Sequence, residues 1–311
     1  TLMGDNSISA YDMRVAVVVL NYNNYFDTVK CVDGILGEDN ISIILVDNAS
    51  TDGSGVMLQE KYSNNNNLFY IQSDENRGYA AGNNIGVQYV LDNLNDDYLC
   101  ILNNDTLPNC HMLRQLARYL ESTPKCGIVG PVILEDKSDN IIQSAGATIN
   151  LRHGDVSLWH RGEQYISKSK AVNCPYVSGA CLMVRTRDFA QLGLIPECYF
   201  LFFEETEWCL QAHRNGFDVV CLWSAFLIHK GSASVSEQGA LAKYLMVRNR
   251  ALFEKRNASM IEYLWFIVYA YIHVFIRYLI KGQDCLWEAS ALCDGLTGHI
   301  SRDFYYIKIG E

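Results

Sequence analysis

Two adjacent acids, Glu204 and Glu205, have the chemistry needed for proton transfer. They open a predicted helix over 204–215, where exposed amides and the helix dipole favour carboxylates, so their position alone requires no catalytic role. The apolar segment 200–203 comes directly before them and should place them at a partly buried edge. Burial and a neighbouring carboxylate raise a pKa, and a carboxyl group tuned in this way can act as a general base.

Polar residues also follow three short apolar runs in the first third of the chain. The runs 14–20, 41–46 and 98–102 are rich in Val, Ile and Leu, and each stops at Asn or Asp. Asn and Asp are ordinary turn formers, so one such ending would say little. Three polar endings, two of them with carboxylates, favour a ligand crevice. The residues are Asn21, Asp47, Asn48, Asp52, Asn103, Asn104 and Asp105.

Helix-length segments, about 25–36 and 80–94, separate these runs. Continuous apolar strands that alternate with helices indicate a parallel sheet buried on both faces. Right-handed crossovers then bring the carboxyl ends of the strands to one edge, where open α/β sheets bind their ligands. The sequence therefore predicts an α/β protein with its site at that edge.

The alternation continues towards the second half of the chain. We expect a helix over 107–126 opened by Pro108, and a strand over 127–134. The polar stretch 135–170 is typical of an insertion or a surface hairpin. Strands are expected at 176–185 and 217–222, and Gly216 should end the helix that begins at Glu204.

Seven motifs in order and spacing resemble glycosyltransferase family 2, particularly its rhamnosyltransferase-like bacterial members. The resemblance covers about residues 14–256, with a weaker echo at 294–298. It implies a GT-A fold: a Rossmann-like, mostly parallel sheet flanked by helices, here with a C-terminal helical extension. It also implies inverting transfer of a sugar from a nucleoside-diphosphate donor. The motifs lie at 17–23, 46–54, 76–84, 102–106, 178–182, 203–209 and 229–232.

The resemblance implies roles for the acidic residues. The family's Asp-x-Asp metal motif falls on residues 103–105, where only Asp105 brings a charge. His229 follows an apolar segment and would be a structural histidine on sequence grounds alone, but the resemblance makes it a second metal ligand. Mn²⁺ suits a mixed nitrogen and oxygen site, and Mg²⁺ remains an alternative. Glu205 matches the family's base, with Glu204 as the alternative.

The same resemblance implies a donor pocket around Asp47, whose carboxylate can accept from a pyrimidine N–H. Arg77 is either a diphosphate contact or a surface charge, and glycines at 78 and 82 would allow a ligand to approach the backbone closely. The implied donor-binding residues are Asn21, Asp47, Asn48, Asp52, Asn76, Arg77, Gly78, Gly82, Asn103 and Asn104.

Three functions remain in competition. The first is an inverting, metal-dependent transferase that moves a sugar from a UDP- or dTDP-sugar to a hydroxyl of a glycan or lipid-linked saccharide in cell-surface polysaccharide synthesis. The second is a catalytically silent nucleotide-sugar or carbohydrate-binding module on the same fold. The third, a nucleotidylyltransferase, would normally show a basic, glycine-rich loop after the first strand, which the residues Asn21 to Asn24 do not form.

Composition narrows the partners and the compartment. The 311 residues carry a net charge of −10, which argues against a nucleic-acid partner. Eleven scattered cysteines favour reduced, buried thiols in a cytoplasmic protein, and the start of the sequence lacks the pattern of a secretory signal. Residues 243–311 hold nine Lys and Arg against seven acids, a net charge of +2, which leaves −12 for residues 1–242.

We divide the chain into a catalytic domain at 14–256 and a C-terminal helical extension at 257–311. Within the domain, 14–134 would form the donor half and 171–256 the acceptor half. In the extension, 263–276 has no charge and would form a helix of roughly 21 Å, too short to span a bilayer core of about 30 Å. Three roles stay open: peripheral contact with the inner face of the cell membrane, a buried or homodimer helix, and a span.

Overall fold

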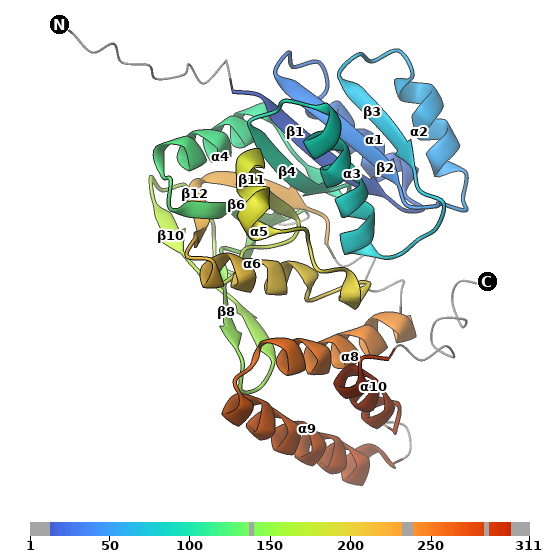
Figure 1. The fold of residues 1–311 in the computed structure, drawn as a ribbon, viewed down its shortest axis with the longest axis vertical. Helices are drawn as coiled ribbons and strands as arrows, with labels where there is room; N and C mark the ends of the chain where they lie inside the picture. Colours follow the sequence, from blue (N-terminus) through green and yellow to red (C-terminus); the bar gives the residue numbers. More distant parts are fainter. Residues whose placement is uncertain (1–12, 137–139, 232–238, 283–285, 300–311) are drawn as a thin grey trace, which may run out of the picture.

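A ten-stranded mixed sheet forms the centre of the molecule. The computed structural model describes residues 13–136, 140–231, 239–282 and 286–299 (Figure 1). Strands follow the order β10-β12-β6-β11-β4-β1-β2-β3, with β5 beside β12 and β7 beside β6. The first four, which pair in parallel, are β1 (Val15–Asn21), β2 (Ile41–Asp47), β3 (Leu68–Gln72) and β4 (Tyr98–Asn103).

The second half of the sheet contains both strand directions. β11 (Cys181–Arg185) runs antiparallel between β4 and β6, whereas β12 (Asp218–His229) is parallel to β6 (Cys126–Glu135). The short strands β5 (Thr106–Leu107), β7 (Ile142–Ser144) and β10 (Ala171–Asn173) complete it. A separate hairpin, β8 (Ala147–Asn150) and β9 (Asp155–Leu158), confirms the hairpin predicted within 135–170.

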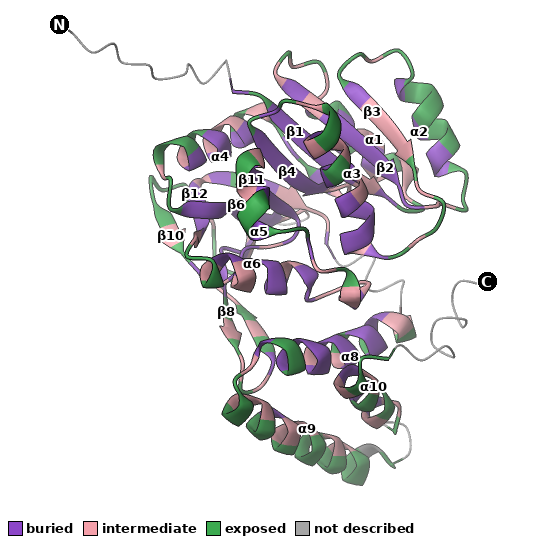
Figure 2. Cartoon of the chain, viewed as in Figure 1, coloured by how far each residue is buried: buried purple, intermediate pink, exposed green. Residues whose placement is uncertain are grey.

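Helices cover both faces of the sheet, as the continuous apolar strands predicted. One buried cluster packs α1 (Tyr25–Asp33), α2 (Ser54–Tyr62) and α4 (Cys110–Ser122) on one face. The other packs α3 (Tyr79–Asn93), α5 (Phe189–Leu192) and α6 (Glu204–Arg214) on the opposite face. Figure 2 shows the strands buried between these layers. The predicted α/β class is therefore confirmed.

Several element boundaries differ from the prediction. Pro108 does not open the fourth helix, because Thr106 and Leu107 pair with β12 and the Asn109 side chain caps the helix instead. α1 ends at Asp33, three residues early. β12 continues to His229, since it pairs with β6 along most of its length. β3 and α2 were not predicted.

Three helices form a separate layer at the C-terminal side: α8 (Gly239–Asn257), α9 (Met260–Lys281) and α10 (Leu286–Thr297). Figure 1 shows this layer beyond the end of the sheet. A Cβ at Gly295 of α10 would lie only 2.1 Å from the backbone oxygen of Arg248 in α8, so glycine permits a close crossing of these helices. The helical layer therefore includes α8 together with the two helices that follow it.

The predicted length of the helix at 263–276 was wrong. α9 spans 22 residues, roughly 33 Å, because a capping box between Ser259 and Glu262 starts it early and it continues through Arg277. By length and composition, its segment Met260–Ile280 could cross a membrane, and only 6% of the most apolar window is buried. The buried-core alternative is thus wrong for most of α9, whose inner face alone packs on α8 and α10.

Candidate active site

Strand register brings the polar endings together, as predicted. Asn21 at the end of β1 pairs with Asp47 at the end of β2, and Leu20 pairs with Asn103 at the end of β4. All three strands run in parallel, so these side chains share the carboxyl edge of the sheet. The far side of this edge receives the start of α6 and the end of β12, which carry Glu204, Glu205 and His229.

Asp47 is the hub of a buried hydrogen-bond network. Its carboxylate accepts from the Asn21 amide at 2.7 Å, from the Ser50 hydroxyl and backbone N–H, and from the Gln72 amide at 2.9 Å. Asn21 is fully buried and its amide oxygen accepts from Thr28. Both residues therefore hold the ends of β1, β2 and β3 in place with their own polar atoms largely satisfied.

A second network fixes the loop at 76–78. The Asn48 amide donates to Asn76 Oδ1 at 2.9 Å, and the same oxygen accepts from the backbone N–H of Gly78. Gly78 has a φ of 98°, and a Cβ there would lie 2.2 Å from the Phe200 backbone oxygen. A Cβ at Gly82 would meet Leu20 at 2.6 Å. Contacts within the chain thus explain both glycines without a ligand.

Asp52 and Arg77 lie at the rim. Asp52 is exposed and accepts from the backbone N–H of Ser54 at the start of α2. The Arg77 guanidinium lies 3.0 Å from Glu197 and is 59% exposed. This ion pair is what the surface-charge alternative for Arg77 predicts. Because exposed ion pairs contribute little to stability, the Arg77 side chain could reorient at small cost in free energy.

The turn at 103–105 presents oxygen atoms to the crevice. Asn104 donates to Thr28 at 2.7 Å, and the Asp105 backbone oxygen accepts from the N–H of Lys230. The side-chain oxygen of Asn103 is buried and has no hydrogen-bond partner among the residues described. A buried acceptor without a donor is costly, so this oxygen is well suited to a ligand or a cation.

The side chains of Asp105 and His229 lie next to each other at this edge of the sheet. His229 Nε2 lies 3.2 Å from Asp105 Oδ1, and Nδ1 lies 2.8 Å from Gln143 Oε1. If Nδ1–H donates to Gln143, the Nε2 lone pair faces a carboxylate, and only a proton or a cation between them removes the repulsion. This donor set fits a divalent cation. In the described parts of the chain, no third His, Cys, Asp or Glu joins it, so a ligand or water would supply the remaining oxygens.

At the start of α6, Glu204 is buried and Glu205 is half-buried. Glu205 accepts from the Tyr176 hydroxyl at 3.1 Å, and a Cβ at Gly179 would lie 2.8 Å from its Oε1, so glycine leaves room for this carboxylate. Burial raises the pKa of both, that of Glu204 strongly, with repulsion from Glu205 adding to it. The Tyr176 hydrogen bond favours the ionised form of Glu205.

Tyr79 connects the two halves of the site. Its hydroxyl donates to the Gly179 backbone oxygen at 2.8 Å. Burial first, and then the charges of Glu205, Glu204 and Asp105, raise the pKa of this phenol well above its usual value. The charges of all three carboxylates therefore act on one side chain. Sequence reasoning missed Tyr79, Tyr176 and Gln143; the position of Tyr79 within the motif at 76–84 was the one available signal.

Two curated glycosyltransferases are similar to this chain in sequence. An Agl10 low-salt glycan biosynthesis hexosyltransferase of Haloferax volcanii is 26% identical over 239 residues, 76% of this chain and 74% of that protein. An N-acetylglucosaminyl-diphospho-decaprenol L-rhamnosyltransferase of Mycobacterium tuberculosis is 24% identical over 223 residues, 65% of this chain and 71% of that protein.

A solved structure shares the fold. The mannosyltransferase PcManGT from Pyrobaculum calidifontis, in complex with GDP-Man and Mn²⁺, has a TM-score of 0.55 at 15% identity, covering 96% of this chain and 79% of that one. The sequence profile of glycosyl transferase family 2 matches residues 16–193, more than half of the chain. The chain is therefore a glycosyltransferase with a GT-A fold and belongs to glycosyl transferase family 2.

Proposed function

We propose that this enzyme is an inverting, metal-dependent glycosyltransferase that moves a sugar from a nucleoside-diphosphate donor to a hydroxyl of a glycan or lipid-linked saccharide. One observation carries the proposal: the charges of Glu205 and Asp105 both act on one half-buried phenol, Tyr79, whose hydroxyl donates to the Gly179 backbone oxygen at the carboxyl edge of the sheet. An inverting transfer needs a base on one side of the sugar and positive charge at the departing diphosphate on the other. This arrangement provides a group for each task.

Glu205 is the base. It must be ionised to take the proton of the acceptor hydroxyl, and the Tyr176 hydrogen bond favours that form. Glu204 is almost fully buried, and burial with repulsion from Glu205 raises its pKa strongly, so it retains the proton that the pair shares. Gly179 lets the Glu205 carboxylate lie against the backbone, where a Cβ would be only 2.8 Å from its Oε1.

Asp105 and His229 hold a divalent cation, Mn²⁺ or Mg²⁺, which when bound supplies positive charge to the departing diphosphate. The 3.2 Å approach of His229 Nε2 to Asp105 supports this assignment, as does the unpartnered oxygen of Asn103 beside it. Gln143 orients the imidazole from behind through Nδ1. The imidazole ligand favours Mn²⁺ over Mg²⁺.

The donor nucleotide lies over the ends of β1, β2 and β3. Because the Asp47 carboxylate already accepts from Asn21, Ser50 and Gln72, we assign it to shaping the pocket as well as meeting a uridine or thymidine base. Asn48 retains an unpartnered buried oxygen among the described residues and is free to accept from the donor. Asn76 and Gly78 position the loop at its side, and Arg77 reaches the diphosphate by leaving Glu197.

The acceptor belongs to glycan or polysaccharide synthesis. The relatives named above are a glycan-biosynthesis hexosyltransferase and a rhamnosyltransferase acting on a diphospho-decaprenol-linked sugar. A saccharide carried on a lipid at the inner face of the cell membrane is therefore the acceptor class we propose.

Release of nucleoside diphosphate from UDP- and dTDP-sugars with Mn²⁺ or Mg²⁺ tests the function. We expect Asp105→Ala and Glu205→Gln each to lower the rate by about 100-fold or more, because each removes a group needed in the transition state. Asp39→Ala and Glu60→Gln, exposed carboxylates outside the crevice, are matched controls. Circular dichroism verifies folding.

Each competing function gives a different result. A silent binding module would bind the nucleotide sugar in calorimetry without releasing diphosphate. A nucleotidylyltransferase would consume a nucleoside triphosphate and release pyrophosphate. Full activity in both Asp105→Ala and Glu205→Gln would overturn the assignment of these residues.

A further inference from the structure

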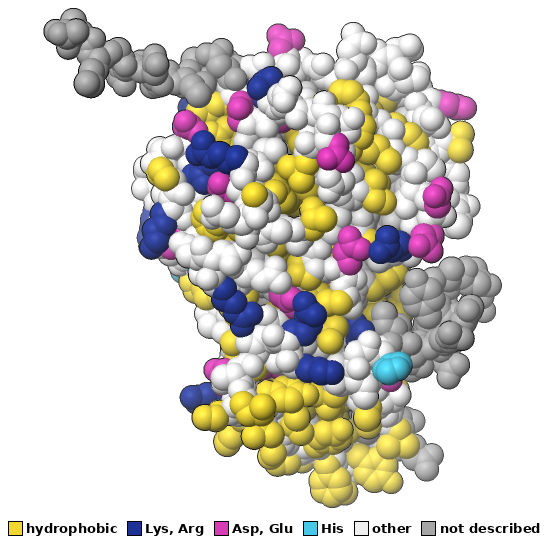
Figure 3. All heavy atoms as spheres, in the orientation of Figure 1, with side chains coloured by type: hydrophobic (Ala, Val, Ile, Leu, Met, Phe, Trp, Pro, Cys, Tyr) yellow, Lys and Arg dark blue, Asp and Glu magenta, His cyan; other side chains and the backbone are white. Residues whose placement is uncertain are grey.

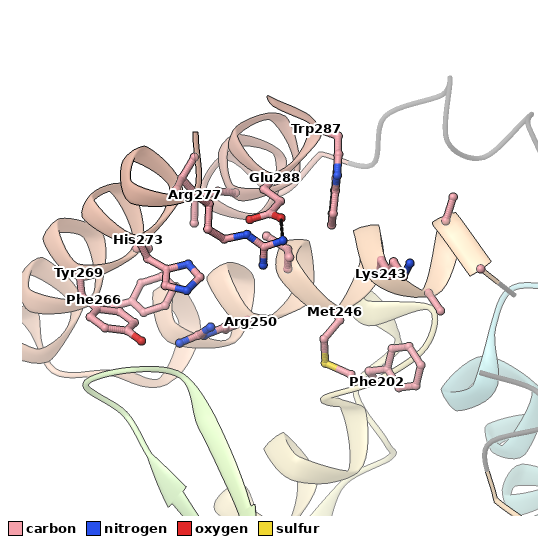
Figure 4. Close-up of a pocket in the computed structure, with 17 residues that line it drawn as sticks. Phe202, Lys243, Met246, Arg250, Phe266, Tyr269, His273, Arg277, Trp287 and Glu288 are labelled. Atoms are coloured by element: carbon pink, nitrogen blue, oxygen red, sulfur yellow. Dashed lines mark ion pairs between the residues drawn. The ribbon is translucent and has the colours of Figure 1, made fainter. Parts of the chain in front are cut away.

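A groove of about 1260 Å³ opens between α8, α9 and α10, outside the crevice that holds Asp105 and Glu205. Apolar side chains, including Met246, Phe266 and Trp287, form much of its wall. Figure 4 shows that Arg250, His273 and Arg277 point into the same space, with Lys243 further along α8. The groove thus combines an apolar wall with a row of nitrogen donors.

Positive charge in the groove exceeds negative charge. The carboxylate lining it, Glu288, pairs with Arg277 at 2.8 Å, and Asp155 outside it pairs with Arg250 at 3.0 Å. Lys243 is exposed and has no ion pair among the described residues, and the buried Nε of Arg277 has no hydrogen-bond partner there. Such a site favours an anion with several acceptor oxygens, such as a phosphate.

The helix that walls the groove carries an apolar outer face. From Trp265 onwards its side chains recur every three or four residues, and each is 54–67% exposed among the residues that the structure describes. Figure 3 shows this hydrophobic surface with Lys and Arg side chains gathered along its border. An apolar face beside a basic border suits the surface of a membrane that contains anionic lipid. The residues are Leu264, Trp265, Val268, Ile272, Phe275 and Leu279.

The inner end of the groove leads towards the catalytic carboxylates. Phe202 lines the groove and stands two residues before Glu204. Asn249 of α8 donates to the Phe202 backbone oxygen, so the wall of the groove and the loop before Glu204 are joined directly. A molecule bound in the groove would therefore have one end near the acceptor side of the site.

We propose that the groove binds the phosphate group of a lipid-linked acceptor, while the outer face of α9 lies in the bilayer surface beside its hydrocarbon chain. Lys243, Arg250 and Arg277 would meet the phosphate oxygens, and the saccharide would extend past Phe202 to Glu205. This inference rests on the proposed function, because it specifies the acceptor of the same reaction.

Vesicle flotation tests the proposal without any sugar donor. We expect the full chain to bind phosphatidylcholine vesicles containing 5 mol% polyprenyl phosphate at least about five-fold more tightly than vesicles of phosphatidylcholine alone. Lys243→Glu should abolish that difference, and Ile272→Glu should weaken binding to both vesicles. Arg118→Glu on α4 and Val56→Glu on α2 make the same changes at exposed positions far from the groove and should bind as the wild type does.

Other results would overturn the proposal. Equal binding of the wild type to both vesicles would rule out the phosphate site, and so would a preference that excess inorganic phosphate in the buffer does not reduce. A dimer in light scattering that Ile272→Glu dissociates, without vesicle binding, would assign the face to a second copy of the chain. Diphosphate release by the wild type without lipid is measured in parallel: its absence counts against the proposed function, and vesicle binding is judged separately.

Discussion

Glu205 differs from Glu204 by one hydrogen bond. Both carboxyl groups are buried at the start of α6, and burial raises the pKa of each. Tyr176 donates to Glu205 at 3.1 Å, and the Oε2 atoms of both carboxyl groups lack a partner among the residues described. Because two close carboxylates titrate as a unit, the hydrogen bond decides which of them is ionised first.

Tyr176→Phe should therefore shift the pH profile. Loss of a hydrogen bond that favours the charged form raises the pKa of Glu205 further, so the acidic limb of kcat/KM moves to higher pH by about one unit. The measurement is diphosphate release across pH 5 to 9. Tyr62→Phe is a matched control, since its hydroxyl bonds to Asp33 away from the crevice. A lower rate with an unmoved limb would reduce Tyr176 to a packing residue.

The sequence predicts which residue types form the site, but it does not predict their contacts. The strand endings predicted that Asn21, Asp47 and Asn103 share an edge, and register confirms it. Nothing in the sequence indicated that Asp47 would already be bonded to Gln72, or that Arg77 would pair with Glu197, which is 120 residues away. Such partners depend on loop geometry, which no periodic pattern encodes.

At the scale of elements, α8 holds the loop that comes before Glu204 and Glu205, the proposed catalytic acids. Phe200, Phe202 and Phe203 have φ values of 69°, 73° and 76°, a left-handed backbone that non-glycine residues adopt at a cost of about 1–3 kcal/mol each. The Asn249 amide donates to the backbone oxygens of residues 199, 201 and 202. The strained loop thus keeps its shape because a buried helix side chain bonds to it.

We expect Asn249→Ala to lower kcat about ten-fold or more and the free energy of unfolding by about 1–3 kcal/mol, because three carbonyls lose their shared donor. KM for the nucleotide sugar should change little, since Asn249 lies away from the donor half. Steady-state kinetics at 25 °C and urea denaturation measure the two effects. Asn93→Ala removes an exposed amide that bonds to Tyr89 and serves as the control. An unchanged kcat in Asn249→Ala would show that the loop holds its shape without the clamp.

Elements with strong apolar patterns were predicted and those set by pairing were not. β1, β2 and β4 are continuous apolar runs and were found at their predicted places. The extension of β12 to His229 depends on its pairing with β6 and β5, which lie far away in sequence. The uncharged stretch between Glu262 and Arg277 predicts too short a helix for α9. Both of these charged residues are compatible with a helix, and α9 contains them.

At the scale of the whole molecule, the β8–β9 hairpin and the helical layer meet around Glu254. This α8 residue is fully buried between the β8–β9 hairpin and α9, and neither of its carboxylate oxygens has a hydrogen-bond partner among the described residues. Burial, with added repulsion from Glu262 and Asp155 against the attraction of Arg250, raises the pKa of Glu254 to about 8. The folded protein therefore binds this proton more tightly than the unfolded chain does.

The free energy of unfolding should consequently fall as the pH rises towards the pKa of Glu254. Since the folded pKa lies above the unfolded value, the contribution of Glu254 is complete below about pH 4.3 and is lost as pH approaches 8. Glu254→Gln keeps the shape and cannot ionise, so relative to the wild type it should gain about 1–3 kcal/mol between pH 5.5 and 8.5, a rise in Tm of about 2–6 °C. Calorimetry of both proteins across this range gives the difference. The exposed substitution Glu60→Gln should show the same dependence of Tm on pH as the wild type. If the curves of Tm against pH for Glu254→Gln and the wild type are parallel, Glu254 is ionised in the folded protein across this range.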